Sequence, residues 1–161
     1  MTPNESGTSI HIGVISDTHG LLRPEAVEAL RGSRHIVHAG DVGAPEILDR
    51  LRAIAPVTAV RGNIDKAAWA SKLRETEVIE IGGVSIYVLH DLGQLDLKPE
   101  AAGFNAVVFG HSHKAIQGQR GGVLYFNPGS AGPRRFKLPV SVGKLIVKKG
   151  GLRGEIITIC D

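Results

Sequence analysis

Cysteine is nearly absent from this sequence of 161 residues, in which Cys160 stands alone. A single cysteine cannot form a disulfide within the chain, which argues against a disulfide-stabilised secreted scaffold. No apolar run approaches the roughly 20 residues that a membrane-spanning helix needs. Residues 1–9 are polar and lack the basic and apolar regions of a signal peptide, so we expect a flexible tail there. These absences predict a cytoplasmic protein with no membrane partner.

A strong charge imbalance is absent too, because 19 Lys and Arg face 16 Asp and Glu, a net charge of +3. A nucleic-acid-binding protein usually gathers its basic residues in a stripe. Here residues 144–153 predict instead a solvated hairpin with a turn at Gly150 and Gly151. We therefore rank nucleic acid below a small-molecule substrate and leave the basic-stripe alternative open. The late basic residues are Arg134, Arg135, Lys137, Lys144, Lys148, Lys149 and Arg153.

The length is typical of one domain, and such a chain can bury roughly two-thirds of its unfolded surface. A hydrophobic fraction of 42% is close to that of ordinary globular proteins. We find no linker, internal repeat or low-complexity tract. The sequence therefore predicts a single domain over residues 1–161, and it leaves self-association into a homo-oligomer open.

Strand-like and helix-like segments alternate through the first half, which predicts a parallel sheet with right-handed crossovers. The expected strands are 10–16, 36–39 and 57–60, and the expected helices are 24–31 and 45–54. The second half predicts hairpins, because Gly-Gly pairs at 82–83 and 121–122 separate short apolar runs. Its expected elements are strands 77–81, 84–89, 106–109, 115–119, 123–126, 141–147 and 155–159, and a short helix at 97–102.

Residues of metal-ligand type follow five of these strands, at the point where each strand ends. Ligands of open α/β sheets bind beyond the carboxyl ends of the strands. Five strands that end in this way therefore direct one set of side chains into one crevice. The residues are Asp17 and His19 in SDTH, Asp41 in AGD, Asn63 in GNID, His90 in YVLH, and His111 and His113 in GHSH.

The residue types indicate two adjacent divalent ions. Carboxylate and amide oxygens suit Mg²⁺ and Mn²⁺, and imidazoles extend the range to Fe, Ni, Co and Zn²⁺. Seven such residues exceed the three or four protein ligands of a single zinc site. Asp41 ends its strand after a glycine, so its carboxylate could reach both ions. Two carboxylates do not neutralise two divalent cations, and the remaining positive charge would attract a phosphate. Mn²⁺ fits this mixed set best.

The ordered motifs D-x-H, G-D, G-N-x-D, H and G-H-x-H resemble the calcineurin-like metallophosphoesterase superfamily. The short length and NPGS at 127–130 look like its small YfcE-type phosphodiesterases. The resemblance runs from Ile10 to Arg135. It implies a four-layer α/β/β/α sandwich of two mixed sheets flanked by helices, and phosphoester hydrolysis by a metal-bound hydroxide.

The same resemblance implies a role for each ligand-type residue. The first metal would be bound by Asp17, His19 and His113. The second metal would be bound by Asn63, His90 and His111. Asp41 would bridge the two ions. The residues implied to be catalytic as well as metal-binding are Asp41, Asn63 and His90.

Two positions depart from the pattern of the larger phosphatases in the superfamily. These read G-N-H-E, whereas this chain has Ile64 in place of the histidine that would protonate the leaving group. Isoleucine cannot donate a proton, which favours substrates with good leaving groups. The usual H-G-H is here His90-Asp91-Leu92, so the ligand His90 is kept, the second histidine is gone, and the acidic Asp91 changes the local charge.

Three further residues are predicted to contact substrate or to support the site, each with a structural alternative. His38 either orients a ligand or substrate or simply packs in the core. Arg134 or Arg135 either holds a phosphate oxygen bidentately or lies on a surface loop. His11 and His35 are expected to be structural or surface residues.

Three functions remain open on the sequence alone. The first is a phosphodiesterase acting on a small phosphoester, and the second is a phosphomonoesterase acting on nucleotides or small phosphates. The third is a non-catalytic scaffold of the same fold, like the retromer subunit. Retention of His90 favours an enzyme over a scaffold, and Ile64 favours diesters over monoesters. Fold alone does not supply the substrate.

Overall fold

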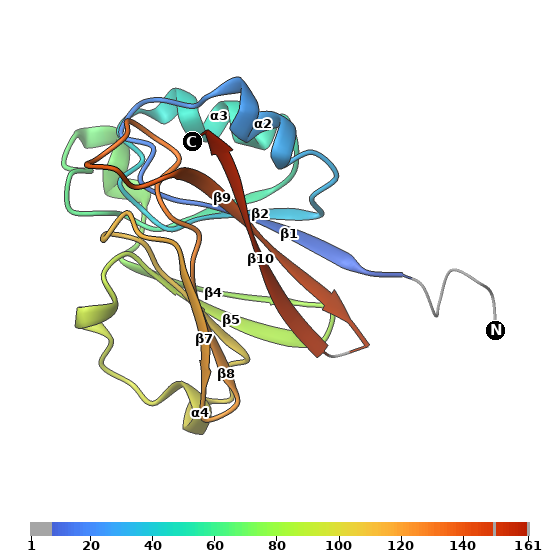
Figure 1. Cartoon of the computed structure of the whole chain (residues 1–161). Helices are drawn as coiled ribbons and strands as arrows, with labels where there is room; N and C mark the ends of the chain where they lie inside the picture. The colour runs from blue at the N-terminus through green and yellow to red at the C-terminus, as the bar shows by residue number, and fades with distance from the viewer. Residues whose placement is uncertain (1–7, 150, 161) are drawn as a thin grey trace.

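Two five-stranded sheets packed face to face form the centre of the molecule (Figure 1). The structure is a computed structural model that describes residues 8–149 and 151–160. The tail expected at residues 1–9 lies for the most part outside this range. The single cysteine, Cys160, is unpaired and partly buried at the end of the last strand.

The first sheet joins the three parallel strands of the first half to the two strands that end the chain, in the order β10-β9-β1-β2-β3. The parallel strands are connected by helices, as expected, and the last two strands run antiparallel. The elements are β1 (Ile10–Ile15), α2 (Pro24–Ala29), β2 (His35–His38), α3 (Pro45–Arg52), β3 (Val57–Ala59), β9 (Val140–Lys148) and β10 (Gly151–Cys160).

The second sheet is mixed and is built from the middle of the chain, in the order β4-β5-β6-β8-β7. Both predicted Gly-Gly hairpins form. Gly82 and Gly83 have φ of 60° and 83°, which a two-residue type I′ turn requires. The strands are β4 (Thr76–Ile81), β5 (Val84–Leu89), β6 (Ala106–Val108), β7 (Ile116–Arg120) and β8 (Val123–Asn127).

Phe126 fixes how closely the two sheets approach each other. Its fully buried ring, on β8 of the second sheet, lies against the backbones of Gly143 on β9 and Gly154 on β10 in the first sheet. A Cβ atom built at either glycine would come within 2.6 Å of a ring carbon. Any side chain at these positions would therefore push the sheets apart. The surrounding core consists of apolar side chains from both sheets.

Helices cover the two outer faces unequally. The apolar sides of α2 and α3 pack on the first sheet, where Leu30, Leu48 and Leu51 are buried. The outer face of the second sheet carries only α4 (Pro99–Ala102), the 3₁₀ helix η2 (Leu92–Gln94) and the chain between them. Figure 1 shows α2 and α3 on one side of the paired sheets and α4 on the other. The predicted four-layer α/β/β/α class is confirmed, with a thin fourth layer.

The predicted hairpin at 144–153 forms, and it is solvated only in part, because Lys148, Lys149 and Arg153 are exposed while residues 145–147 are buried. β9 lies between β1 and β10 and is largely buried. Gly151 already pairs with Lys148 in the ladder, so it is not a turn residue, and position 150 lies outside the described residues. The sequence prediction was wrong about the burial of β9. The prediction gave weight to the basic side chains, whereas the apolar side chains of β9 are buried because β1 and β10 lie on either side of it.

Two short elements were not predicted from the sequence, η2 and the 3₁₀ helix η1 (Ala68–Lys72). Within the described residues, no helix is both long enough and apolar enough to cross a bilayer. The cytoplasmic location inferred from the composition stays a prediction.

Substituting Gly143 with alanine should destabilise the protein by about 1–3 kcal/mol, the usual cost of inserting a methyl group into a packed core. The matched control is Gly118→Ala on β7, where an added Cβ meets no atom within 4 Å. Urea unfolding of both variants measures the difference. Equal stabilities for the two would contradict the packing role given to Phe126.

Candidate metal centre

All seven ligand-type residues lie just beyond strand ends, in the loops that follow β1, β2, β3, β5 and β6. Figure 1 shows these loops gathered at one end of the paired sheets. Seven non-glycine residues among those described have positive φ, and five of them belong to this set. Such backbone conformations cost energy and persist where the surrounding structure enforces them, commonly at functional sites. The five are Asp17, His19, Asp41, His111 and His113.

Two buried carboxylates form the centre of the site. Asp17 is fully buried and Asp41 is 3% exposed. The Nε2 atoms of His19 and His90 lie 3.4 Å and 3.2 Å from Oδ2 of Asp41. The Nε2 atom of His113 lies 3.3 Å from Oδ1 of Asp17. Two groups therefore have ligand atoms within 4.8 Å of one another, and Asp17 belongs to both: Asp17, His19 and His113, and Asp17, Asp41 and His90.

One oxygen of each carboxylate is held by the protein, and the other faces the imidazoles. Oδ2 of Asp17 accepts hydrogen bonds from the Ser16 hydroxyl, at 2.7 Å, and from the backbone N–H of His111, at 3.1 Å. Oδ1 of Asp41 accepts the backbone N–H of Ile64, at 3.1 Å. The remaining oxygens, Asp17 Oδ1 and Asp41 Oδ2, are the ones that approach the histidines.

Several buried polar atoms at this point have no hydrogen-bond partner: Asp17 Oδ1, His19 Nε2, His90 Nε2 and His113 Nδ1. Buried polar groups are normally paired, so such a cluster needs an explanation. A divalent cation would satisfy carboxylate and imidazole lone pairs together. The donor set therefore fits a metal.

His90 shows how the fold prepares an imidazole for this role. Its Nδ1 donates a proton to the carbonyl of Ala39, at 2.7 Å, so Nε2 is the nitrogen that faces the carboxylates. This is the arrangement by which proteins orient metal-binding histidines. Burial would lower the pKa of His90, but Asp41 and Asp17 outweigh it and raise that pKa.

The carboxylates are held in their charged form by the same contacts. Burial alone would raise the pKa of Asp17, but His113 and Ser16 outweigh it and lower the pKa. For Asp41, burial is likewise outweighed by His90 and by the Ile64 N–H, so its pKa is also lowered. Both groups are therefore ready to accept a cation at neutral pH.

Asn63 and His111 are placed at the edge of this cluster. The His111 ring meets the His90 ring edge-on, with centroids 5.2 Å apart. Asn63, His90 and His111 line one cleft of about 280 Å³, whereas Asp17 and His19 lie outside its walls. The structure therefore brings all seven predicted residues to one region, with the second predicted set facing the cleft.

Comparison with known proteins agrees with this geometry. Residues 10–150 match the model of the calcineurin-like phosphoesterase superfamily domain. The chain belongs to that superfamily. It is 36% identical over 157 residues to a probable metallophosphoesterase of Methanothermobacter thermautotrophicus, covering 91% of each chain. It is 29% identical over 160 residues to phosphodiesterase YfcE of Escherichia coli, covering 81% of this chain and 84% of that one.

Solved structures share the fold. An archaeal phosphodiesterase superposes with a TM-score of 0.77 at 22% identity, over 92% of this chain and 100% of that one. Vps29 of Entamoeba histolytica, complexed with Zn²⁺, superposes with a TM-score of 0.72 at 24% identity, over 93% of this chain and 99% of that one. Metallophosphoesterases use divalent metals, in line with the donor set described above.

Two further residues support the site, of which Asp65 was not assigned from the sequence and Asn127 was expected only to set the NPGS turn beside it. Asp65, the last residue of GNID, is 3% exposed and accepts the backbone N–H groups of Val42, Gly43 and Gly62. It ties the loop after β2 to the loop after β3. Asn127 of NPGS donates to the carbonyl of Gly110, at 3.1 Å, and steadies the GHSH loop. Their place inside the quoted motifs was the available indication.

Gly110 is required by close approach. A Cβ atom there would lie 2.7 Å from Oδ2 of Asp17 and would also strike the Ser16 hydroxyl. The glycine of GHSH therefore lets the loop after β6 lie directly on the loop after β1. This contact joins the two sheets at the site.

The structure corrects the prediction that His38 contacts substrate. Its side chain is fully buried. Its Nδ1 accepts the N–H of Gly40, at 3.1 Å, so Nε2 carries the proton and donates to the Thr18 hydroxyl, at 3.0 Å. Burial lowers the pKa of His38 to about 4, which keeps the ring neutral. His38 thus connects the loop that carries Asp17 to the loop that carries Asp41. Of its two predicted roles, the structure favours packing in the core, where the side chain also positions these loops.

The two predicted phosphate-binding arginines lie on a separate surface. Arg134 and Arg135 are exposed on the loop between β8 and β9, and neither lines the cleft beside His90. The loop nevertheless begins against the site, because the Ser130 hydroxyl donates to the carbonyl of Asp17. Ile64 is 42% exposed above Asp41. A phosphate-binding role for either arginine stays a prediction.

Mn²⁺ should raise the melting temperature of chelator-treated protein by roughly 5–10 °C at about a hundredfold excess over its dissociation constant. Asp17→Asn should remove most of this shift, because it deletes a charged ligand shared by both groups. Asp49→Asn, on the exposed side of α3, is the control and should keep it. Differential scanning calorimetry measures the shifts; a full shift in Asp17→Asn would show that the metal binds elsewhere.

Proposed function

We propose that this chain is a phosphodiesterase that uses two divalent ions, with Mn²⁺ the best fit to its ligands. The observation that carries the proposal is the buried, unpartnered Oδ1 of Asp17, which the unpartnered Nε2 atoms of His19 and His90 approach from the two sheets, to 3.8 Å and 3.9 Å. The probable metallophosphoesterase and the phosphodiesterase that resemble the chain support the reaction class.

The contacts support a division of the ligands into two sets with Asp41 between them. The first set is Asp17, His19 and His113, and the second is Asn63, His90 and His111. Oδ2 of Asp41 lies nearer to the imidazoles of His19 and His90, at 3.4 Å and 3.2 Å, than Oδ1 of Asp17 does, at 3.8 Å and 3.9 Å. Asp41 is therefore the better candidate for a bridging ligand.

When bound, two such ions supply the positive charge that holds a phosphate and a water molecule acidified enough to attack it. The protein's part is to keep the ligands oriented. Ser16 and the backbone N–H of His111 hold Asp17, the N–H of Ile64 holds Asp41, and the carbonyl of Ala39 holds His90. These bonds fix the ligands before substrate arrives.

Ile64 favours diesters with good leaving groups. Its backbone N–H donates a hydrogen bond to Oδ1 of Asp41, while its exposed side chain has no proton to donate to a departing alkoxide. General acid catalysis commonly contributes about 10²–10⁴-fold, so its absence penalises poor leaving groups most. A monoesterase that acts on ordinary alkyl phosphates would need that donor.

The scaffold alternative has a specific basis, because Vps29 proteins share this fold. A Vps29 protein has also been solved in complex with Zn²⁺, so ligands held in place support metal binding in both cases. Metal-dependent hydrolysis is the property that separates the enzyme from the scaffold.

Asp41→Asn should lower the binding of both metal equivalents, since one charged oxygen is removed from between the two sets. His90→Ala should lower mainly one equivalent. His11→Ala removes an imidazole from β1, outside both ligand sets, and is the control. Metal content after Mn²⁺ loading and dialysis, measured by mass spectrometry, decides. Loss of one equivalent in Asp41→Asn with the other at normal affinity would contradict a bridging role.

The Mn²⁺-loaded protein should hydrolyse bis-p-nitrophenyl phosphate faster than p-nitrophenyl phosphate and should lose both activities on chelation. Across a series of aryl phosphodiesters, the rate should fall steeply as the pKa of the leaving phenol rises, because no acid protonates it. Steady-state rates, with the chemical step shown to limit turnover, provide the slope.

A flat slope would mean that another group donates the proton. Full activity in protein verified to be free of metal would end the proposed function. A preference for the monoester would favour the phosphomonoesterase alternative.

A further inference from the structure

The cleft beside the second ligand set extends well past the metal centre and has the opposite charge. One end is formed by Asn63, His90 and His111. His90, which is 5% exposed, thus lies between this cleft and Oδ2 of Asp41, which is 3.2 Å from its Nε2 atom. The walls continue along β4, β5 and η2, so a phosphate at the metal centre would leave one of its ester groups inside the cleft.

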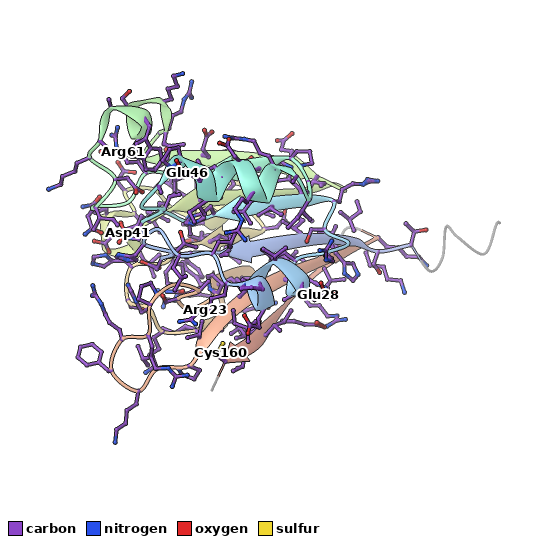
Figure 2. All side chains as sticks on the ribbon, turned by 90° about the horizontal axis from the view of Figure 1, so that it is seen from above. Arg23, Glu28, Asp41, Glu46, Arg61 and Cys160 are labelled. Carbon is purple, nitrogen blue, oxygen red and sulfur yellow. The ribbon has the colours of Figure 1, made fainter. Side chains whose placement is uncertain are left out.

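Acidic side chains predominate on the walls away from the metal centre. Glu75, Asp91 and Asp96 line the cleft, and Arg61 is the one Lys or Arg among the lining residues. Figure 2 shows Arg61 and Asp41 at the same end of the molecule. The Arg61 guanidinium lies 3.3 Å from Glu75 and offsets part of its charge. Among the described residues, neither Asp91 nor Asp96 is in an ion pair, although Oδ1 of Asp91 accepts the N–H of Gly93.

An aromatic ring adds to this wall. Tyr87 of β5 lines the cleft and packs against Phe104, with ring centroids 5.1 Å apart. Leu89, also of β5, lies beside it. Tyr87 is 7% exposed, so its ring offers little surface and the carboxylates carry most of the attraction for an alkylammonium group. The side chains of Thr76 and Gln94 complete a lining that is more polar than apolar.

We propose that the cleft binds an alkylammonium group on one ester arm of the substrate, so that the preferred substrates are zwitterionic phosphodiesters. This inference rests on the proposed function. The metal centre would attract the phosphate, and the wall of Asp91, Asp96 and Glu75 would attract the cation. The two ends of the cleft thus match the two charges of such a molecule. Asp91, which stands at the glycine position of H-G-H, becomes a specificity residue.

The test compares two substrates of the same shape and different charge, using the Mn²⁺-loaded protein. One is p-nitrophenyl phosphorylcholine. The other is p-nitrophenyl 3,3-dimethylbutyl phosphate, in which carbon replaces the choline nitrogen. Both release the same phenol, so leaving-group effects cancel in the ratio of their kcat/KM values.

The wild-type ratio should favour the choline ester by about fivefold or more, the effect of one opposite charge near contact distance in water. It should shrink as ionic strength rises, because the wall is open to solvent. The metal centre alone would repel the cation and favour the uncharged isostere. A preference for the choline ester therefore cannot come from the metals.

Variants of the wall should move the ratio in opposite directions. Asp91→Asn and Asp96→Asn should lower it, whereas Arg61→Gln should raise it by freeing Glu75. Asp49→Asn, on α3 and outside the cleft, should leave the ratio unchanged. A general loss of folding would change both substrates alike and so would not produce these opposite shifts.

Hydrolysis of both esters with a ratio of one or below would overturn the inference and leave the proposed function standing. Hydrolysis of neither ester by protein that does hydrolyse bis-p-nitrophenyl phosphate would overturn the inference alone, and hydrolysis of none of the three substrates would overturn both. A wild-type preference that Asp91→Asn and Asp96→Asn both leave intact would also overturn it, since the wall would then not be its source.

Discussion

The burial of two carboxylates at the junction of two sheets is the constraint on which the site depends. Asp17 and Asp41 are taken almost entirely out of water, which is costly for charged groups unless they are paired and hydrogen-bonded. The protein supplies hydrogen bonds to one oxygen of each carboxylate, from backbone N–H groups or a hydroxyl. The other oxygens face imidazoles and are suited to a cation.

This arrangement requires the two sheets to hold a fixed position relative to each other. The first sheet supplies the carboxylates and the second supplies His90, His111 and His113. The distance between the sheets is set away from the site, where Phe126 rests on the bare backbones of Gly143 and Gly154. A structural contact in the core is thereby linked to the spacing of the ligands. His38 and Asp65 act in the same direction by tying neighbouring loops together.

In the proposed function, metal binding and substrate selection would be carried by different parts of the molecule. The metal centre is buried and held by short hydrogen bonds, so it suits a reaction common to the superfamily. The cleft beyond it is lined by partly exposed side chains from β4, β5 and η2. Residues such as Asp91 and Asp96 can change without disturbing the ligands. A conserved reaction with variable substrates is the expected consequence of this division.

The sequence by itself determined the local elements and the ligand types. The Gly-Gly turns, the first-half helices and the strand ends were predictable because they depend on backbone preferences and periodicity within a few residues. The convergence of Asp17 and Asp41 could also be expected, since carboxyl ends of neighbouring parallel strands share an edge, whereas His90 follows a strand of the other sheet. The superfamily resemblance added the pairing of the sheets.

Only the tertiary structure decided the features that depend on distant packing. β9 reads as a charged hairpin arm but is buried, because β1 lies on one side of it and β10 on the other. His38 reads as a substrate contact but is enclosed, because the loops after β1 and β2 close over it. The acidic cleft joins Arg61, Tyr87 and Asp96, which are far apart in the chain. The burial of a residue and the shape of a cleft depend on residues that are distant in the sequence. A local sequence pattern therefore does not predict them.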